Sequence, residues 1–220
     1  MATAIVTGAN RGIGLELCRQ LSQRGDNVVA VCRKSSPALD GLGIKVIDKI
    51  NVGDTSTMPM LTEATKGMRI DLLINNAGVL ATDSFDAFNE EGMRLQFEVN
   101  TLGPLRVTRA LVDNLNQGAK VGIVTSRMGS IADNTSGGYY GYRMSKAGVN
   151  AIGKSMAIDL RARGIAVVLL HPGFVRTDMT QGAGQIDTET SARGLLKQLD
   201  ATTLERTGKF MHMSGEELPW

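Results

Sequence analysis

The sequence has few cysteines, few aromatic residues and no long apolar run. Its 220 residues include two cysteines, Cys18 and Cys32, and aromatic side chains make up 4% of the chain. Two cysteines are too few for a disulfide scaffold, and no Cys/His cluster has the spacing of zinc ligands. We therefore expect two buried thiols in a reducing cytoplasm and no metal site. No apolar run approaches the roughly 20 residues of a membrane span.

Positive and negative side chains are nearly balanced, and the net charge is +2. Such a balance provides no electrostatic footprint for nucleic acid. The amino terminus has neither the basic region nor the apolar core of a secretory signal. Because no linker, low-complexity tract or repeat interrupts the chain, we expect one cytoplasmic domain over residues 1–220 with no nucleic-acid or membrane partner.

Apolar runs alternate with stretches of helical periodicity, and most of the runs are apolar throughout, as in strands buried on both faces. This alternation predicts an α/β fold with a doubly wound, Rossmann-type parallel sheet of about seven strands and helices on both faces. Ligands of such sheets bind at the carboxyl ends of the strands. Strands are expected at 3–8, 27–32, 44–50, 70–78, 119–126, 164–173 and 208–213, and helices at 14–24, 54–66, 84–98, 101–117, 140–163 and 188–200.

The segment "TGANRGIG" (7–14) lies between the first strand and the first helix. Gly8 allows a tight turn, Gly12 allows the backbone to approach a pyrophosphate, and Gly14 allows the helix and strand to pack closely. The unpaired N–H groups of the helix N-terminus then face the anion. The alternative is a glycine-rich turn without a ligand.

The end of the second strand distinguishes the two nicotinamide dinucleotides, because an acidic residue there binds the 2′-hydroxyl of NAD. Here Arg33 and Lys34 stand in that place, and Arg11 lies in the glycine loop. Guanidinium groups bind phosphate bidentately. The three residues together favour NADPH/NADP over NAD, although each alone fits a solvated surface charge.

All three tyrosines lie in "SGGYYGYRMSK" (136–146). A phenol with a pKa near 10 needs a fixed cation to act as an acid–base catalyst near neutral pH. On a helix that cation lies three or four residues away. Tyr142 has Lys146 there and Tyr139 has Arg143, whereas Tyr140 has none, so two pairs remain open. Ser126, at the end of the preceding strand, can donate to a substrate carbonyl oxygen or simply form a turn.

Several motifs occur in one order along nearly the whole chain, and together they resemble the short-chain dehydrogenase/reductase family. Within that family, "LHPGFVRTDMT", "IDTETSARGL" and "GKFMHMSGEELPW" resemble the sniffer-type and C-factor-like carbonyl reductases. The motifs are TGxxxGIG at 7–14, NNAG at 75–78, Asn100, Ser126, Tyr142-x-x-x-Lys146 and Pro172-Gly173-x-Val175-x-Thr177.

The resemblance implies a role for each catalytic residue. Tyr142 would protonate the substrate oxygen, and Ser126 would hold that oxygen. Lys146 would lower the pKa of Tyr142 and bind the nicotinamide ribose, and Asn100 would support a water that links Lys146 to solvent. The cofactor-binding residues would be Gly8, Asn10, Arg11, Gly12, Ile13, Gly14, Arg33, Asn51, Val52, Asn76, Ala77, Gly78, Tyr142, Lys146, Pro172, Gly173, Val175 and Thr177.

The chain departs from the family pattern in two places. Asn51-Val52 stands where the family has aspartate and an aliphatic residue against adenine, so we expect a weaker contact through the carboxamide. Tyr142 lies sixteen positions after Ser126, a few more than usual. The extra residues are expected to form a flap, in which Tyr139 and Tyr140 either contact substrate or pack at the surface.

The expected function is NADPH-dependent reduction of aldehydes or ketones. The predicted substrate lid, about residues 178–187, is short and contains Gly182 and Gly184, which favours an open site accepting several small carbonyl substrates. The alternatives are a 3-oxoacyl reductase of the same chemistry and a C-factor-like signalling protein that binds the cofactor.

Family relatives are often dimers or tetramers, so a homodimer or homotetramer through the helices at 101–117 and 140–163 is expected. Leu102, Leu105, Leu111 and Leu115 fit either that interface or the core.

Overall fold

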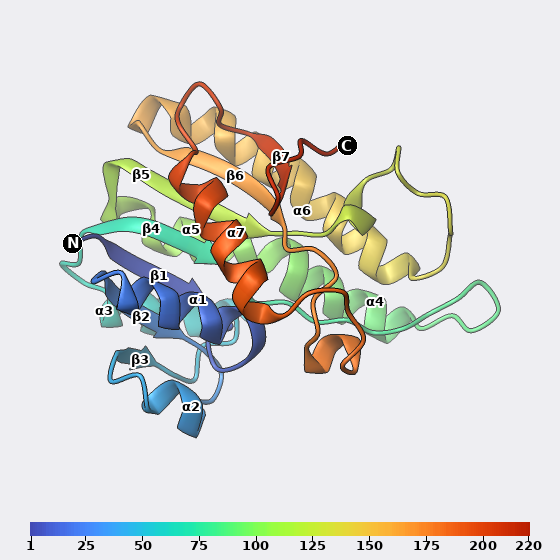
Figure 1. Ribbon diagram of the computed structural model, residues 1–220, viewed down its shortest axis with the longest axis horizontal. Helices are drawn as coiled ribbons and strands as arrows, with labels where there is room; N and C mark the ends of the chain where they lie inside the picture. Colours follow the sequence, from blue (N-terminus) through green and yellow to red (C-terminus); the bar gives the residue numbers. More distant parts are fainter.

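Seven parallel strands form one sheet in the computed structural model, which describes residues 1–220 (Figure 1). The strand order is β3-β2-β1-β4-β5-β6-β7, with the reversal between β1 and β4 typical of doubly wound sheets. The strands are β1 (Thr3–Thr7), β2 (Asn27–Val31), β3 (Lys45–Ile47), β4 (Ile70–Asn75), β5 (Leu115–Val124), β6 (Ala166–His171) and β7 (Lys209–His212).

Helices cover both faces of the sheet, which confirms the predicted fold class. One core cluster lies between the sheet and α3, α5 and α6, and a second lies between the sheet and α1, α2 and α7. The helices are α1 (Gly12–Gln23), α2 (Pro37–Asp40), α3 (Met58–Ala64), α4 (Glu90–Gln96), α5 (Gly103–Leu111), α6 (Tyr140–Asp159) and α7 (Thr188–Asp200), with a π-helix at Phe97–Leu102. No helix is both long and apolar enough to cross a membrane.

Some predicted boundaries are wrong. The helix expected at 84–98 begins at Glu90, because the Asn89 side chain accepts a hydrogen bond from Gly92 N at 2.9 Å and caps it there. The helix expected at 101–117 ends early, and β5 begins at Leu115. The short helix α2 was not predicted, although Ser36-Pro37 is an N-cap followed by a first-turn proline.

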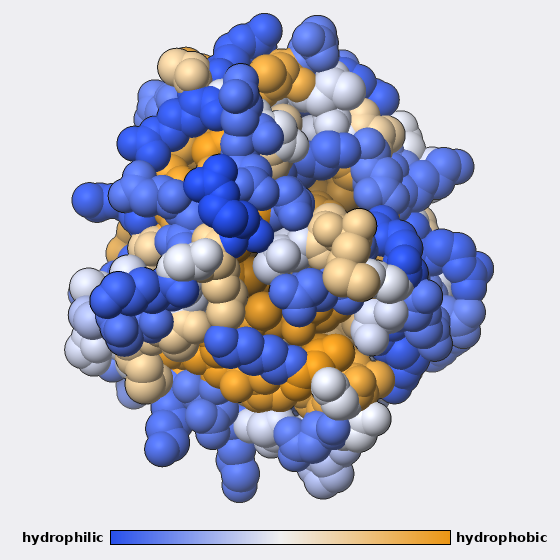
Figure 2. Space-filling model, turned by 90° about the vertical axis from the view of Figure 1, so that its left-hand side faces the viewer, coloured by the Kyte–Doolittle hydropathy of each residue, from blue (hydrophilic) through white to orange (hydrophobic).

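The leucines considered for an interface divide between core and surface. Leu111 and Leu115 are buried in the core cluster under α5, whereas Leu102 and Leu105 are partly exposed. At the end of the molecule where the strands begin, hydrophilic residues cover much of the surface, with apolar patches between them (Figure 2).

Gly153 of α6 packs directly on the sheet. A Cβ atom there would lie 2.8 Å from Leu169 Cδ2 and 3.1 Å from Ile123 Cδ1. We expect Gly153→Val to lower the free energy of unfolding by about 1–3 kcal/mol through overpacking. The midpoint of urea unfolding at unchanged slope measures this. Ala151→Val on the exposed face of α6 is the control, with an expected loss of about 0.7 kcal/mol at most. A Gly153 variant as stable as the wild type would contradict the close packing.

Candidate active site

A cleft of about 690 Å³ opens at the carboxyl ends of the strands. It lies beyond the ends of β1 and β4, where the strand order reverses, as expected for a doubly wound sheet. Most of the predicted site residues line it, whereas Gly173, Val175, Asn100 and Ser126 lie outside its lining. The predicted residues in the lining are Gly8, Asn10, Arg11, Gly12, Ile13, Gly14, Arg33, Asn51, Val52, Asn76, Ala77, Gly78, Tyr142, Lys146, Pro172 and Thr177.

The glycine loop between β1 and α1 has no room for side chains at two of its glycines. Gly8 has φ 66°, and a Cβ there would lie 2.7 Å from Ala77 Cα. A Cβ on Gly14 would lie 2.3 Å from the Gly8 carbonyl oxygen. The Asn76 side chain braces the loop by donating to Thr7 O at 3.0 Å. No side chain caps the N-terminus of α1, so its first N–H groups remain available to an anion.

Positive charge dominates the cleft. Arg11, Arg33, Arg176 and Lys146 line it, and Asp178 is the one carboxylate in the lining. Arg33 is exposed at the end of β2, as predicted, whereas Lys34 lies outside the cleft. This composition suits a polyanionic ligand.

Arg11 and Asp178 form an ion pair across the mouth of the cleft, with Arg11 Nη1 3.1 Å from Asp178 Oδ2. The two side chains are 65% and 74% exposed, so this pair contributes little stability and opens readily. It joins the glycine loop to the turn at Asp178–Thr180. The sequence placed Asp178 in the predicted lid rather than in the cofactor site and did not single out Arg176, although both flank Thr177.

Tyr142 and Lys146 lie one turn apart on α6, and both face the cleft. Lys146 is 4% exposed, and its Nζ donates to Val124 O at 3.0 Å and lies 5.7 Å from the centre of the Tyr142 ring. Ser126 follows β5, and its Oγ accepts from Met128 N at 3.1 Å. The structure thus brings the Ser126 turn and the two α6 residues to one end of the sheet.

Burial moves the two α6 groups toward their neutral forms. It raises the pKa of Tyr142 to about 12, with the neighbouring Ser126 hydroxyl acting in the opposite direction. It lowers the pKa of Lys146 to about 8. The net shift in the pKa of Tyr142 is therefore upward in the protein alone, because desolvation of the phenolate outweighs the hydrogen bond from Ser126. The lowering of this pKa by Lys146 stays a prediction. At neutral pH the phenol holds its proton.

The alternative pair, Tyr139 and Arg143, lies outside this cleft. Arg143 donates to Ser136 Oγ at 2.9 Å and to Gly138 O at 3.0 Å, so it supports the loop before α6. Tyr139 and Tyr140 are 40% and 43% exposed.

Asn100 lies in the π-helix, a wide turn often found at functional sites. Its side chain is buried and makes three hydrogen bonds. Oδ1 accepts from Val79 N at 2.8 Å, and Nδ2 donates to Val79 O at 2.8 Å and to Ser145 Oγ at 3.0 Å. Asn100 therefore ties the loop after β4 to the helix that carries the catalytic candidates.

The segment after β6 contributes some residues to the lining of the cleft and others to the packing behind it. Pro172 and Thr177 line the cleft, whereas Gly173 and Val175 pack behind it against Ile186. A Cβ on Gly173, which has φ 84°, would lie 2.9 Å from Ile186 Cδ1.

Known proteins resemble the chain in sequence along its full length. A family profile described as short chain dehydrogenase matches residues 2–187. The chain is 42% identical over 226 residues to 1-hydroxy-2-glutathionyl-2-methyl-3-butene dehydrogenase of Rhodococcus sp., with 100% of both chains covered. It is 47% identical over 154 residues to the C-signal protein of Myxococcus xanthus, which covers 69% of this chain and 93% of that protein.

Solved structures resemble it in fold. Carbonyl reductase Sniffer of D. melanogaster matches with a TM-score of 0.92 and 28% identity over 100% of both chains. An NADPH-bound carbonyl reductase from chicken fatty liver matches with a TM-score of 0.89 and 28% identity over 100% of this chain and 99% of that one. These similarities confirm the resemblance expected from the motifs. The chain belongs to the short-chain dehydrogenase/reductase family of oxidoreductases.

Proposed function

We propose that the protein is an NADPH-dependent reductase that converts an aldehyde or ketone to an alcohol, with Tyr142 as the general acid. The observation that carries this proposal is the single cleft in which Tyr142 and Lys146 meet the glycine loop and three arginines. The similarity of the chain to an NADPH-bound carbonyl reductase supports the choice of cofactor and of reaction.

The residues of the cleft fit a nicotinamide dinucleotide phosphate. The uncapped N-terminus of α1 and the side-chain-free glycine loop suit the pyrophosphate. Arg33 suits the 2′-phosphate, and Arg11 joins it when its exposed ion pair with Asp178 opens. Asn51 and Val52 would hold the adenine, and Pro172 and Thr177 would hold the nicotinamide end, with Gly173 and Val175 shaping that segment from behind.

The chemistry at Tyr142 follows from its protonation. Bound NADPH supplies the hydride that reduces the carbonyl carbon. Ser126 Oγ donates a hydrogen bond to the carbonyl oxygen, and Tyr142 gives its phenolic proton to that oxygen as negative charge develops there. The phenol becomes a phenolate, which the Lys146 ammonium stabilises. Asn100 holds the adjoining loop and α6 in register and would support a water that links Lys146 to solvent. The proton lost by Tyr142 would be replaced from solvent along this route.

Residues 178–187 are proposed as the substrate lid. The lid contains Gly182 and Gly184 and no lysine or arginine, so it lacks the basic patch that a protein-bound 3-oxoacyl substrate would favour. Small carbonyl compounds therefore remain the preferred substrates, and assembly into dimers or tetramers through α5 and α6 remains a proposal.

A second candidate is the reverse reaction, oxidation of an alcohol. The Rhodococcus relative, 42% identical over its whole length, is named as a dehydrogenase of a glutathionyl alcohol. A cofactor-binding signalling role is the third, on the similarity to the C-signal protein. Oxidation and signalling would both use the same cleft. Measuring turnover in each direction distinguishes carbonyl reduction from alcohol oxidation.

Arg33 is expected to select the cofactor. By isothermal titration calorimetry, the wild-type protein should bind NADPH at least tenfold more tightly than NADH, a difference of about 1.4 kcal/mol. Arg33→Ala should remove that difference, because the 2′-phosphate loses its bidentate partner. Arg163→Ala, an exposed arginine paired with Asp113 beyond the end of α6, is the matched control and should keep it. Equal affinities in the wild type would exclude NADPH as the preferred cofactor.

Tyr142→Phe removes only the phenolic oxygen. We expect carbonyl reduction to fall by about 10²–10⁴ because the proton donor is lost. NADPH affinity should change little, which calorimetry on the same sample checks. Tyr140→Phe is the matched control, because it removes the same phenolic oxygen from an exposed side chain two residues away. Full activity in the Tyr142 variant would remove Tyr142 from the mechanism.

The pH dependence of kcat for reduction should reflect the ionisation of Lys146. Because its pKa is about 8, the ammonium and its stabilisation of the phenolate are present below that pH and lost above it. Tyr142, with a pKa of about 12, stays protonated throughout. The kcat for reduction should therefore be flat at low pH and fall above about pH 8. In Lys146→Arg the guanidinium stays charged, so the remaining activity should lack this fall. A wild-type rate that rises through pH 8–10 would contradict the assignment.

A further inference from the structure

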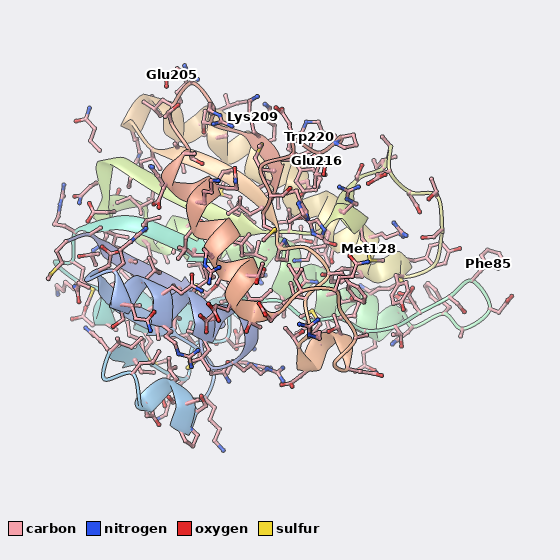
Figure 3. All side chains as sticks on the ribbon, in the orientation of Figure 1. Phe85, Met128, Glu205, Lys209, Glu216 and Trp220 are labelled. Atoms are coloured by element: carbon pink, nitrogen blue, oxygen red, sulfur yellow. The ribbon has the colours of Figure 1, made fainter.

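A second hollow, of about 700 Å³, lies beside the cleft between two loops. One loop follows β4 and contributes residues 82–87, and the other precedes α6 and contributes residues 136–139. Met128 and Arg143 complete the lining; Met128 lies two positions after Ser126, and Arg143 directly follows Tyr142. Met128 lies close to the body of the molecule, whereas Phe85 marks the outer tip of the first loop (Figure 3). Residues of the hollow are therefore sequence neighbours of both Ser126 and Tyr142.

Polar and charged side chains line part of this hollow. Thr82, Ser84 and Ser136 bring hydroxyl groups, and Gly137 and Gly138 expose main chain. Three of the ten lining residues are hydrophobic. These hydroxyl and main-chain groups can form hydrogen bonds with a polar extension of a substrate.

Two opposite charges are fixed in the hollow without forming an ion pair with each other. Arg143 is held by the Ser136 hydroxyl and the Gly137 and Gly138 carbonyls, and it has no carboxylate partner. Asp83 accepts from Tyr140 N and, at 2.8 Å, from Gly141 N, so it caps α6 from another loop. Each charge is held in place by backbone groups and retains hydrogen-bonding capacity.

We propose that this hollow binds the zwitterionic α-amino-acid end of a substrate, with its carboxylate on Arg143 and its ammonium on Asp83. Nε and Nη2 of Arg143 donate to the loop, so its Nη1 group is left to donate to a carboxylate. The Asp83 carboxylate, which already accepts two N–H groups, has lone pairs left for an ammonium. The proposal rests on the proposed function and narrows its substrates to carbonyl compounds that carry an amino acid or a γ-glutamyl peptide, such as thioether conjugates of glutathione.

The test compares three ketones under NADPH. They share a 3-oxobutyl thioether, carried by glutathione, by N-acetylated glutathione or by uncharged 2-mercaptoethanol. We expect kcat/KM to be at least tenfold higher for the glutathione thioether than for the uncharged one, mainly through KM, with the N-acetylated compound between them. A ratio near one in the wild-type protein would overturn the proposal without any variant.

Two variants test the binding role proposed for each charged residue. Arg143→Gln should collapse the preference for both carboxylate-bearing compounds, and Asp83→Asn only the gap between free and N-acetylated glutathione. Arg94→Gln, which removes an exposed arginine of α4 paired with Glu90, is the matched control and should keep the full ratio. Retention of the ratio in Arg143→Gln would also overturn the proposal.

Failure of the proposed function gives a different result. If NADPH binds but none of the ketones is reduced, carbonyl reduction is wrong. Calorimetric titration of the glutathione thioether into the NADPH complexes of the wild type and of Arg143→Gln then tests binding in the hollow independently of catalysis. Absence of binding, or binding that Arg143→Gln leaves unchanged, would overturn it.

Discussion

The close packing of α6 on its neighbours is the constraint on which the site depends. A Cβ on Gly129 would lie 2.7 Å from the Lys146 carbonyl carbon, and one on Gly148 would lie 2.9 Å from Thr101 Cγ2. At Gly153 the same helix meets the sheet. Because these contacts leave no free space, α6 has one position relative to β5 and the π-helix, and its two catalytic candidates acquire a fixed place beside the cleft.

This packing also sets the electrostatics. It buries the Lys146 ammonium against the Val124 carbonyl and desolvates the Tyr142 phenol, so the same burial lowers one pKa and raises the other. A phenol that keeps its proton at neutral pH is suited to donate it, which agrees with the reductive direction.

The groups proposed to bind the substrate lie on loops rather than on the sheet, as is usual where a rigid scaffold presents variable segments. Those loops are nevertheless held by specific contacts. Asp83 reaches across 57 residues to the first N–H groups of α6, and Arg143 reaches back to the loop that precedes its own helix. The groups that order the entrance are therefore also the charged groups that a substrate meets. The predicted flap contains both exposed tyrosines, and only Tyr139 lines the second hollow.

The sequence by itself determined the strand and helix order, the glycine loop, the basic residue after β2 and the spacing of Tyr142 and Lys146. These features depend on neighbours in the chain, or on the rule that parallel strands end at one edge, so local patterns predict them. The sign of the Tyr142 pKa shift, the Arg11–Asp178 pair and the second hollow were decided by the tertiary structure alone. Each of these three depends on burial or on contacts between residues distant in sequence. The helix boundary followed from one capping side chain, which outweighed a periodicity that extended past it.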